Sequence, residues 1–214
     1  MASLTYFTGP MNCGKSTLAL QIDFTESSAG RRGLRYTCLD RGGAARITSR
    51  IGLGEDAIEV TDRLDFWDAV TGELTAGRRV DYLVCDEAQF YAPAHVDDLA
   101  RLVDELAIDV YCFGILADFR TELFPGSRRL VELADSIQLL QARPRCWCGA
   151  PATHNARVVD GIMVTVGDQV VVGDTGGGGA VSYEVLCRRH HRALEPAAVA
   201  RVDLTPDPLP FDEG

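Results

Sequence analysis

The chain has 214 residues, of which 46% are hydrophobic, and it carries a formal net charge of −10. This length accommodates one α/β domain with a small appendage, and the apolar runs are too short to cross a membrane. The acidic balance disfavours binding to a nucleic-acid backbone, so neither nucleic acid nor membrane is an expected partner. The first residues enter a strand-like pattern without a signal sequence, which predicts a cytoplasmic protein.

Strands and helices alternate along the first two thirds of the chain. A buried strand is predicted at 3–8, followed by a Gly-containing loop and a helix over 16–29. Later ranges are predicted as strands at 34–39, 80–85, 108–114 and 136–141, as helices at 64–76 and 93–106, and as a surface loop at 40–56. This alternation predicts an α/β fold with a mainly parallel sheet and helices on both faces.

The composition changes near Pro144, where Cys, His, Gly and Val residues begin to cluster in short strand-like runs. We therefore expect an α/β domain over 1–143, a small β-rich domain over 144–194 and a poorly ordered acidic tail over 195–214. The run of glycines at 176–179 predicts a flexible loop within the second of these parts.

The loop after the first strand reads Gly9-Pro10-Met11-Asn12-Cys13-Gly14-Lys15-Ser16, with Thr17 next, and fits the pattern G-x-x-x-x-G-K-[ST]. In this pattern, backbone N–H groups at a helix start surround phosphates, the lysine reaches the β- and γ-phosphates, and the serine hydroxyl ligates Mg²⁺. Lys15 is the only lysine among 21 basic residues, and its compact ammonium suits such a site better than a planar guanidinium. The loop predicts ATP binding; a chance Gly/Ser turn is the alternative, which the flanking strand and helix disfavour.

The apolar run at 80–85 ends in Asp86-Glu87-Ala88-Gln89. Because the carboxyl ends of parallel strands face one crevice, Asp86 is expected near Lys15 as a Mg²⁺ ligand. Glu87 is then placed to take a proton from the group that attacks the γ-phosphorus. If water attacks the γ-phosphorus, the protein is an ATPase; if a substrate hydroxyl attacks it, the protein is a kinase. The motif leaves both open, and it also resembles the metal-binding box of helicases.

Seven cysteines without a secretory signal disfavour a disulfide framework. Cys146-x-Cys148 and Cys187-x-x-His190 can form a tetrahedral Cys₃His zinc site of structural type, with His191 as a substitute for His190. The first pair is tighter than the usual C-x-x-C, and free thiols are the alternative. Such a site would hold both ends of the segment 149–186, which has little apolar content of its own.

Four motifs, in this order, resemble those of the type II, zinc-containing thymidine kinase family. They are Gly-Pro-Met-x-x-Gly-Lys-Ser-Thr at 9–17, Asp-Glu-Ala-Gln-Phe at 86–90, Asp118-Phe119-Arg120 with Phe124, and Tyr183-x-x-x-Cys187-x-x-His190. The resemblance covers about residues 3–192. It implies a RecA-like P-loop domain with a zinc-ribbon or lasso domain, and transfer of the γ-phosphoryl group of ATP to the 5′-hydroxyl of thymidine, and of deoxyuridine, giving dTMP and ADP. It also implies a homotetramer.

The same resemblance implies roles for individual residues. Glu87 is the general base and Asp86 serves Mg²⁺. A lasso over about 160–183 closes on the nucleoside, and the thymine pocket and lasso contacts comprise Met11, Phe90, Phe119, Phe124, Val172, Gly173 and Tyr183. From the residues alone, Phe119 and Phe124 can equally belong to the hydrophobic core. The chain departs from the family in the spacing of Asp40-Arg41, so no phosphate-binding role is assigned to Arg41 or Arg46.

Two other classes of protein stay open from the sequence. A nucleic-acid-dependent ATPase with a zinc ribbon would explain Asp-Glu-Ala-Gln, but the charge of −10 and a length too short for two motor domains oppose it. A non-catalytic zinc-ribbon adaptor that binds nucleotide as a switch is the second, and Glu87 beside the metal site argues against it.

Overall fold

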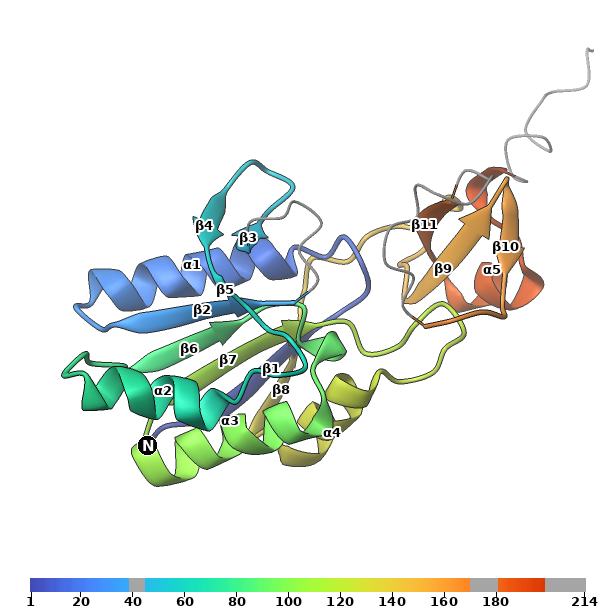
Figure 1. Cartoon of the computed structure of the whole chain (residues 1–214). Helices are drawn as coiled ribbons and strands as arrows, with labels where there is room; N and C mark the ends of the chain where they lie inside the picture. Colours follow the sequence, from blue (N-terminus) through green and yellow to red (C-terminus); the bar gives the residue numbers. More distant parts are fainter. Residues whose placement is uncertain (39–44, 170–180, 199–214) are drawn as a thin grey trace, which may run out of the picture.

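The computed structural model describes residues 1–38, 45–169 and 181–198. Two β-sheets lie at opposite ends of the molecule (Figure 1). We call the six-stranded sheet with its helices the large lobe, and the three-stranded sheet with the Cys/His cluster the small lobe. Residues 170–180 and 199–214, which include Val172, Gly173, the glycine run and most of the predicted tail, lie outside the described residues.

The sheet of the large lobe is parallel throughout. Its strands are β1 (Leu4–Thr8), β2 (Gly33–Thr37), β5 (Ile58–Glu59), β6 (Tyr82–Cys85), β7 (Asp109–Gly114) and β8 (Ser136–Leu139), in the spatial order β5-β2-β6-β7-β1-β8. Every residue of β1 and β6 is buried, as expected for apolar strands covered on both faces. The predicted α/β fold with a parallel sheet is confirmed. The short strand β5 was not predicted.

Helices cover both faces of this sheet (Figure 1). Helix α1 (Lys15–Ser28) lies on one face, where its Ala19 and Leu20 pack with Phe7 and Phe113. Helices α2 (Phe66–Thr75), α3 (Pro93–Leu106) and α4 (Pro125–Leu133) lie on the other face and bury a larger apolar cluster that includes Phe66, Leu99 and Leu130. Helix α3 begins at its proline, where a missing N–H costs nothing. Helix α4 was not predicted.

The predicted surface loop at 40–56 is wrong for part of its length. Strands β3 (Arg46–Thr48) and β4 (Gly54–Asp56) pair as a short antiparallel ribbon. The side chain of Ile47 is 1% exposed and joins the apolar cluster on the α1 side of the sheet. Strands of three residues are too short to show a period in the sequence. Asp40 and Arg41 lie outside the described residues.

The small lobe is an antiparallel sheet with a short helix. Its strands β9 (His154–Val159), β10 (Ile162–Val164) and β11 (Val181–Leu186) follow the order β10-β9-β11, and helix α5 (Arg188–Ala193) comes after them. A two-residue turn, Asp160-Gly161, joins β9 to β10, and both of its residues have positive φ, as this hairpin type requires. None of the described helices is long and apolar enough to cross a membrane.

Candidate active site and metal cluster

The phosphate-binding loop joins β1 to α1. Asn12 and Gly14 adopt left-handed backbone conformations, with φ of 65° and 85°, which bends the loop sharply before the helix. A Cβ atom on Gly9 would lie 2.7 Å from the Cys13 sulfur, so a larger residue here would displace the Cys13 side chain. The Lys15 ammonium donates to the carbonyl oxygen of Pro10 at 2.9 Å and therefore lies within the curve of its own loop. The predicted loop geometry is present, with the only lysine at its centre.

Asp86 follows β6 and reaches the start of α1. Its side chain is 4% exposed, and its carboxylate accepts hydrogen bonds from the Ser16 hydroxyl and from the backbone N–H of Glu87. The pKa of Asp86 is raised to about 6, first by burial and then by the negative charge of Glu87. The two hydrogen bonds and the positive charge of Lys15 act in the opposite direction. The structure thus brings together Lys15, Ser16, Asp86 and Glu87, and the oxygens of Ser16 and Asp86 are donors of the kind that Mg²⁺ prefers.

Glu87 is held by a neighbour, Gln89, which the sequence indicates only as part of the motif at 86–90. Glu87 has a left-handed backbone, with φ of 53°. The buried Gln89 donates from its amide nitrogen to the Glu87 carboxylate and accepts from the backbone N–H of Ile115 at 3.2 Å. A Cβ atom on Gly114 would lie 2.7 Å from the Gln89 amide oxygen. Gln89 therefore connects Glu87 to the end of β7 and limits the orientations of its carboxylate.

The aromatic residues assigned to the nucleoside pocket separate into two places. Phe90 and Phe124 contact edge to face, with ring centroids 5.4 Å apart. Phe119 is buried and lies near the guanidinium group of Arg157, which belongs to β9 of the small lobe. Tyr183, on β11, pairs in register with the same Arg157. The structure therefore brings Phe90 and Phe124 together, and it associates Phe119 and Tyr183 with the small lobe.

The loop after β7 carries a series of contacts to the small lobe that the sequence analysis missed. Each of residues 117–120 forms one hydrogen bond to the small lobe. The pairs are Ala117 with Asn155, Asp118 with Gln169, Phe119 with His191, and Arg120 with the carbonyl oxygen of Gly167. The partners lie tens of residues apart in the chain and follow no periodic pattern. The only sequence signal for this junction was the Asp118-Phe119-Arg120 motif.

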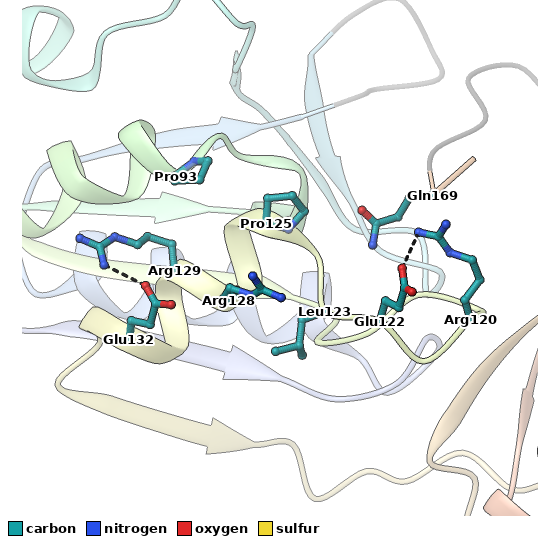
Figure 2. A pocket seen from close by; sticks show the side chains of 9 residues that line it. All are labelled: Pro93, Arg120, Glu122, Leu123, Pro125, Arg128, Arg129, Glu132 and Gln169. Atoms are coloured by element: carbon teal, nitrogen blue, oxygen red, sulfur yellow. Dashed lines mark hydrogen bonds and ion pairs between the residues drawn. The ribbon is translucent and has the colours of Figure 1, made fainter. Parts of the chain in front are cut away.

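A cavity of about 300 Å³ lies on the outer side of the same loop, against α4. Figure 2 shows Arg120 and Glu122 joined by an ion pair beside Gln169, with Arg129 and Glu132 forming a second pair along the helix. The residues that line this cavity do not include Lys15, Ser16, Asp86 or Glu87. This cavity is therefore distinct from the site at Lys15 and Asp86.

The ligand atoms of Cys146, Cys148, Cys187 and His190 all lie within 4.8 Å of one another. The Cys146 sulfur is 3.3 Å from Nδ1 of His190, and ligands of a tetrahedral zinc ion are separated by about 3.3–3.8 Å when bonds are 2.0–2.3 Å long. The tight Cys-x-Cys pair fits because Gly149, with φ of 84°, closes a turn back onto the carbonyl oxygen of Cys146. The donor set and its spacing therefore suit a structural metal ion.

The two neighbouring histidines have different partners. The ring of His190 stacks on Trp147 with centroids 4.0 Å apart, and its Nε2 lies 3.7 Å from a Glu195 carboxylate oxygen. Metal-binding histidines commonly point their second nitrogen at a carboxylate in this way. His191 instead forms a 3.0 Å hydrogen bond between its Nε2 and the carbonyl oxygen of Phe119. His190 is therefore the histidine of the cluster.

The thiols of the cluster differ in their surroundings. Burial raises the pKa of the Cys146 thiol. The backbone N–H of His190, at the start of α5, lowers the pKa of Cys187. A thiol with a lowered pKa gives up its proton more readily, and the thiolate is the form that binds a metal ion.

Comparisons with known proteins agree with the motifs. The family model for thymidine kinase matches residues 2–191. A thymidine kinase of Cutibacterium acnes is 61% identical over 212 residues, which cover 99% of this chain and 98% of that protein. A thymidine kinase of Streptomyces coelicolor is 55% identical over 98% of both chains, and one of Novosphingobium aromaticivorans is 41% identical over 89% of this chain and 96% of that protein. The chain belongs to the thymidine kinase family.

Proposed function

We propose that this protein is a thymidine kinase that transfers the γ-phosphoryl group of ATP to the 5′-hydroxyl of thymidine, giving ADP and dTMP. Deoxyuridine is the second expected acceptor. The observation that carries the proposal is the convergence of Lys15, Ser16, Asp86 and Glu87 at the carboxyl edge of the sheet. Ligands of open parallel sheets bind at this edge.

The residues of the large lobe divide the phosphoryl transfer between them. Backbone N–H groups of the loop 9–17, in which Pro10 has none to donate, surround the phosphates, and Lys15 reaches the β- and γ-phosphates. Ser16 and Asp86 would hold Mg²⁺, which would neutralise charge on the phosphate oxygens. Glu87 accepts the proton of the nucleoside 5′-hydroxyl. At the same time, the hydroxyl oxygen bonds to the γ-phosphorus, and the bond from the γ-phosphorus to the leaving oxygen of ADP breaks. Gln89 keeps the Glu87 carboxylate oriented for this step.

The nucleoside is held on the other side of the γ-phosphate. Met11, Phe90, Phe119 and Phe124 surround the thymine base, and Val172, Gly173 and Tyr183 belong to the segment 160–183 that closes over it. The edge-to-face contact of Phe90 with Phe124 brings two aromatic rings together close in sequence to Glu87, which supports an apolar contact surface for the base. Closure excludes water, so ATP is spent on thymidine rather than on hydrolysis.

The small lobe provides the anchor for that closing segment. We propose a structural zinc ion bound by Cys146, Cys148, Cys187 and His190, because three thiols and one imidazole form a closed set of four ligands. It holds both ends of the segment 149–186 within a domain over 144–194, next to a nucleotide-binding domain over 1–143. The family resemblance supports a homotetramer. The net charge of −10 disfavours binding to nucleic acid, and we propose a cytoplasmic location.

The direct test is ATP consumption by the purified protein with Mg²⁺, with and without thymidine, measured together with dTMP. One dTMP for each ADP, and only in the presence of thymidine, is the expected result. ATP hydrolysis that ignores thymidine or that rises with single-stranded DNA would contradict the proposal. Deoxyuridine, deoxycytidine and deoxyadenosine offered in parallel measure the selectivity of the pocket.

A further inference from the structure

Asn155 lies in the small lobe but contacts the two loops of the large lobe that border the active site. It is part of β9 and is 7% exposed. Its side-chain oxygen accepts from the backbone N–H of Met11 at 2.9 Å, and its side-chain nitrogen donates to the carbonyl oxygen of Ala117 at 3.0 Å. Met11 belongs to the phosphate-binding loop, and Ala117 belongs to the loop after β7.

A carboxamide suits this position because it places an acceptor and a donor at the end of one short side chain. Met11 offers a donor and Ala117 an acceptor, so both ends of the Asn155 amide have a partner. An aspartate would keep the acceptor but would turn an oxygen toward the carbonyl of Ala117. A leucine has a similar volume and would leave both backbone groups without their partner. Loss of a partner for a buried backbone group is costly, so this contact fixes the separation of the two loops.

Asn155 differs from the other contacts between the lobes. Gln169 donates to Asp118 at 3.1 Å, and His191 bonds to Phe119. These contacts hold the loop after β7 to the small lobe and do not include the phosphate-binding loop. Of these three side chains from the small lobe, Asn155 is the one that also holds Met11.

We propose that Asn155 is a positioning residue that couples nucleoside binding to ATP binding. The inference rests on the proposed function, since it takes residues 9–17 as the ATP site and the small lobe as part of the nucleoside site. A nucleoside that binds to the small lobe restricts the motion of β9. Because Asn155 on β9 accepts from the Met11 N–H, this restriction extends to the start of the phosphate-binding loop. Coupling of two binding equilibria is reciprocal, so ATP tightens nucleoside binding by the same factor.

The test is the affinity of the full chain for a non-hydrolysable ATP analogue with Mg²⁺, measured by calorimetry with and without saturating thymidine. In the unaltered protein, thymidine should increase the affinity for the ATP analogue about 5-fold or more. In Asn155→Leu, the effect of thymidine should fall below about 2-fold, while each ligand alone still binds. Thr153→Val is the control, because it removes a side-chain hydrogen bond of the small lobe, to His154, lies outside the segment 160–183 and leaves Asn155 with both of its partners. It should retain the coupling.

Three results would overturn the inference and leave the proposed function intact. They are full coupling in Asn155→Leu, equal loss of coupling in Thr153→Val, and absence of coupling in an unaltered protein that makes dTMP. Failure of the unaltered protein to bind either ligand would instead remove the proposed function and this inference together. Thermal melts check the fold of each variant. If Asn155→Leu does not fold, Asn155→Asp replaces it, and coupling at the level of the unaltered protein in that variant would equally contradict the inference.

Discussion

The two lobes are stabilised in different ways. The large lobe buries apolar clusters on both faces of its sheet, with Phe66, Leu99 and Leu130 on one face and Phe7 and Phe113 on the other. The small lobe buries Cys146, Ala152, Ala156, Met163 and Leu186. This second core is small, and one of its members is a thiol of the metal cluster. A core of this size rarely stabilises a lobe alone. The large lobe therefore supplies the rigid frame, and the small lobe depends on contacts with the large lobe and on the metal ion that we propose for its Cys/His cluster.

Removal of the metal ion is expected to have the largest effect, and to affect one lobe. Structural zinc binding contributes about 10–16 kcal/mol in zinc-finger peptides, so a chelator should unfold the small lobe while the helical circular dichroism of the large lobe remains. Trp147 stacks on His190 and reports the loss. The chain has two tryptophans, so Trp67→Phe makes Trp147 the only fluorophore of its type. Unchanged Trp147 fluorescence and an unchanged protease digest after chelation would rule out a structural metal.

Glu87→Gln should separate the chemistry of the large lobe from its stability. Loss of the general base should lower kcat by about 100-fold to 10,000-fold, while ATP-analogue binding and the melting of both lobes stay close to those of the unaltered protein. Initial rates of dTMP formation provide the measurement. Glu105→Gln, at an exposed position on α3, is the control and should keep full activity. Near-normal turnover in Glu87→Gln would remove Glu87 from its role.

Leu99→Ala tests the statement that apolar packing stabilises the large lobe. Leu99 is fully buried on α3, and truncation of such a leucine costs about 2–5 kcal/mol of unfolding free energy. Leu74→Ala makes the same change at a side chain that is 36% exposed on α2, and it should cost less than about 1 kcal/mol. Urea unfolding followed by circular dichroism distinguishes the two. Equal losses would mean that the core does not determine the stability of this lobe.

Arg101→Gln should have the smallest effect. The Arg101 guanidinium forms an exposed ion pair with Glu105 and lies 3.5 Å from the centroid of the Trp67 ring. Solvent screens exposed pairs of this kind, so the Tm should fall by less than about 3 °C. Glu105→Gln removes the ion pair and keeps the ring contact, which separates the two contributions. A fall in Tm as large as that of Leu99→Ala would show that surface contacts matter here as much as the core.

Chemistry that constrains local sequence was predictable. The phosphate-binding loop needs left-handed residues, a lysine and a hydroxyl at fixed spacing, and each of them stands in the printed sequence at 9–16. Strands β1 and β6 and helix α3 were predicted because burial leaves continuous apolar runs or a helical period. The family assignment followed from the order of several such motifs and is confirmed by the comparisons.

Features that depend on distant backbone groups were not predictable. Asn155 and Gln89 each bind backbone groups far away in the chain, and a lone amide side chain gives no periodic signal. Helix α4 carries a glycine in its first turn, which weakens the helical pattern. That glycine, Gly126, is required because a Cβ atom there would lie 2.4 Å from the carbonyl oxygen of Ala88. Glycine is needed there because α4 approaches the turn after Glu87 closely. A contact between segments so far apart in the chain leaves no local sequence pattern.

The only lysine of the chain has a consequence for chemical labelling. Its side-chain amine lies inside the phosphate-binding loop, where it donates to the carbonyl oxygen of Pro10. The other basic side chains are guanidinium groups, which amine-directed acylating reagents leave unmodified under mild conditions. Among the side-chain amines of the printed sequence, such a reagent therefore has one target, Lys15. Acylation of that side-chain amine would directly mark the proposed nucleotide site.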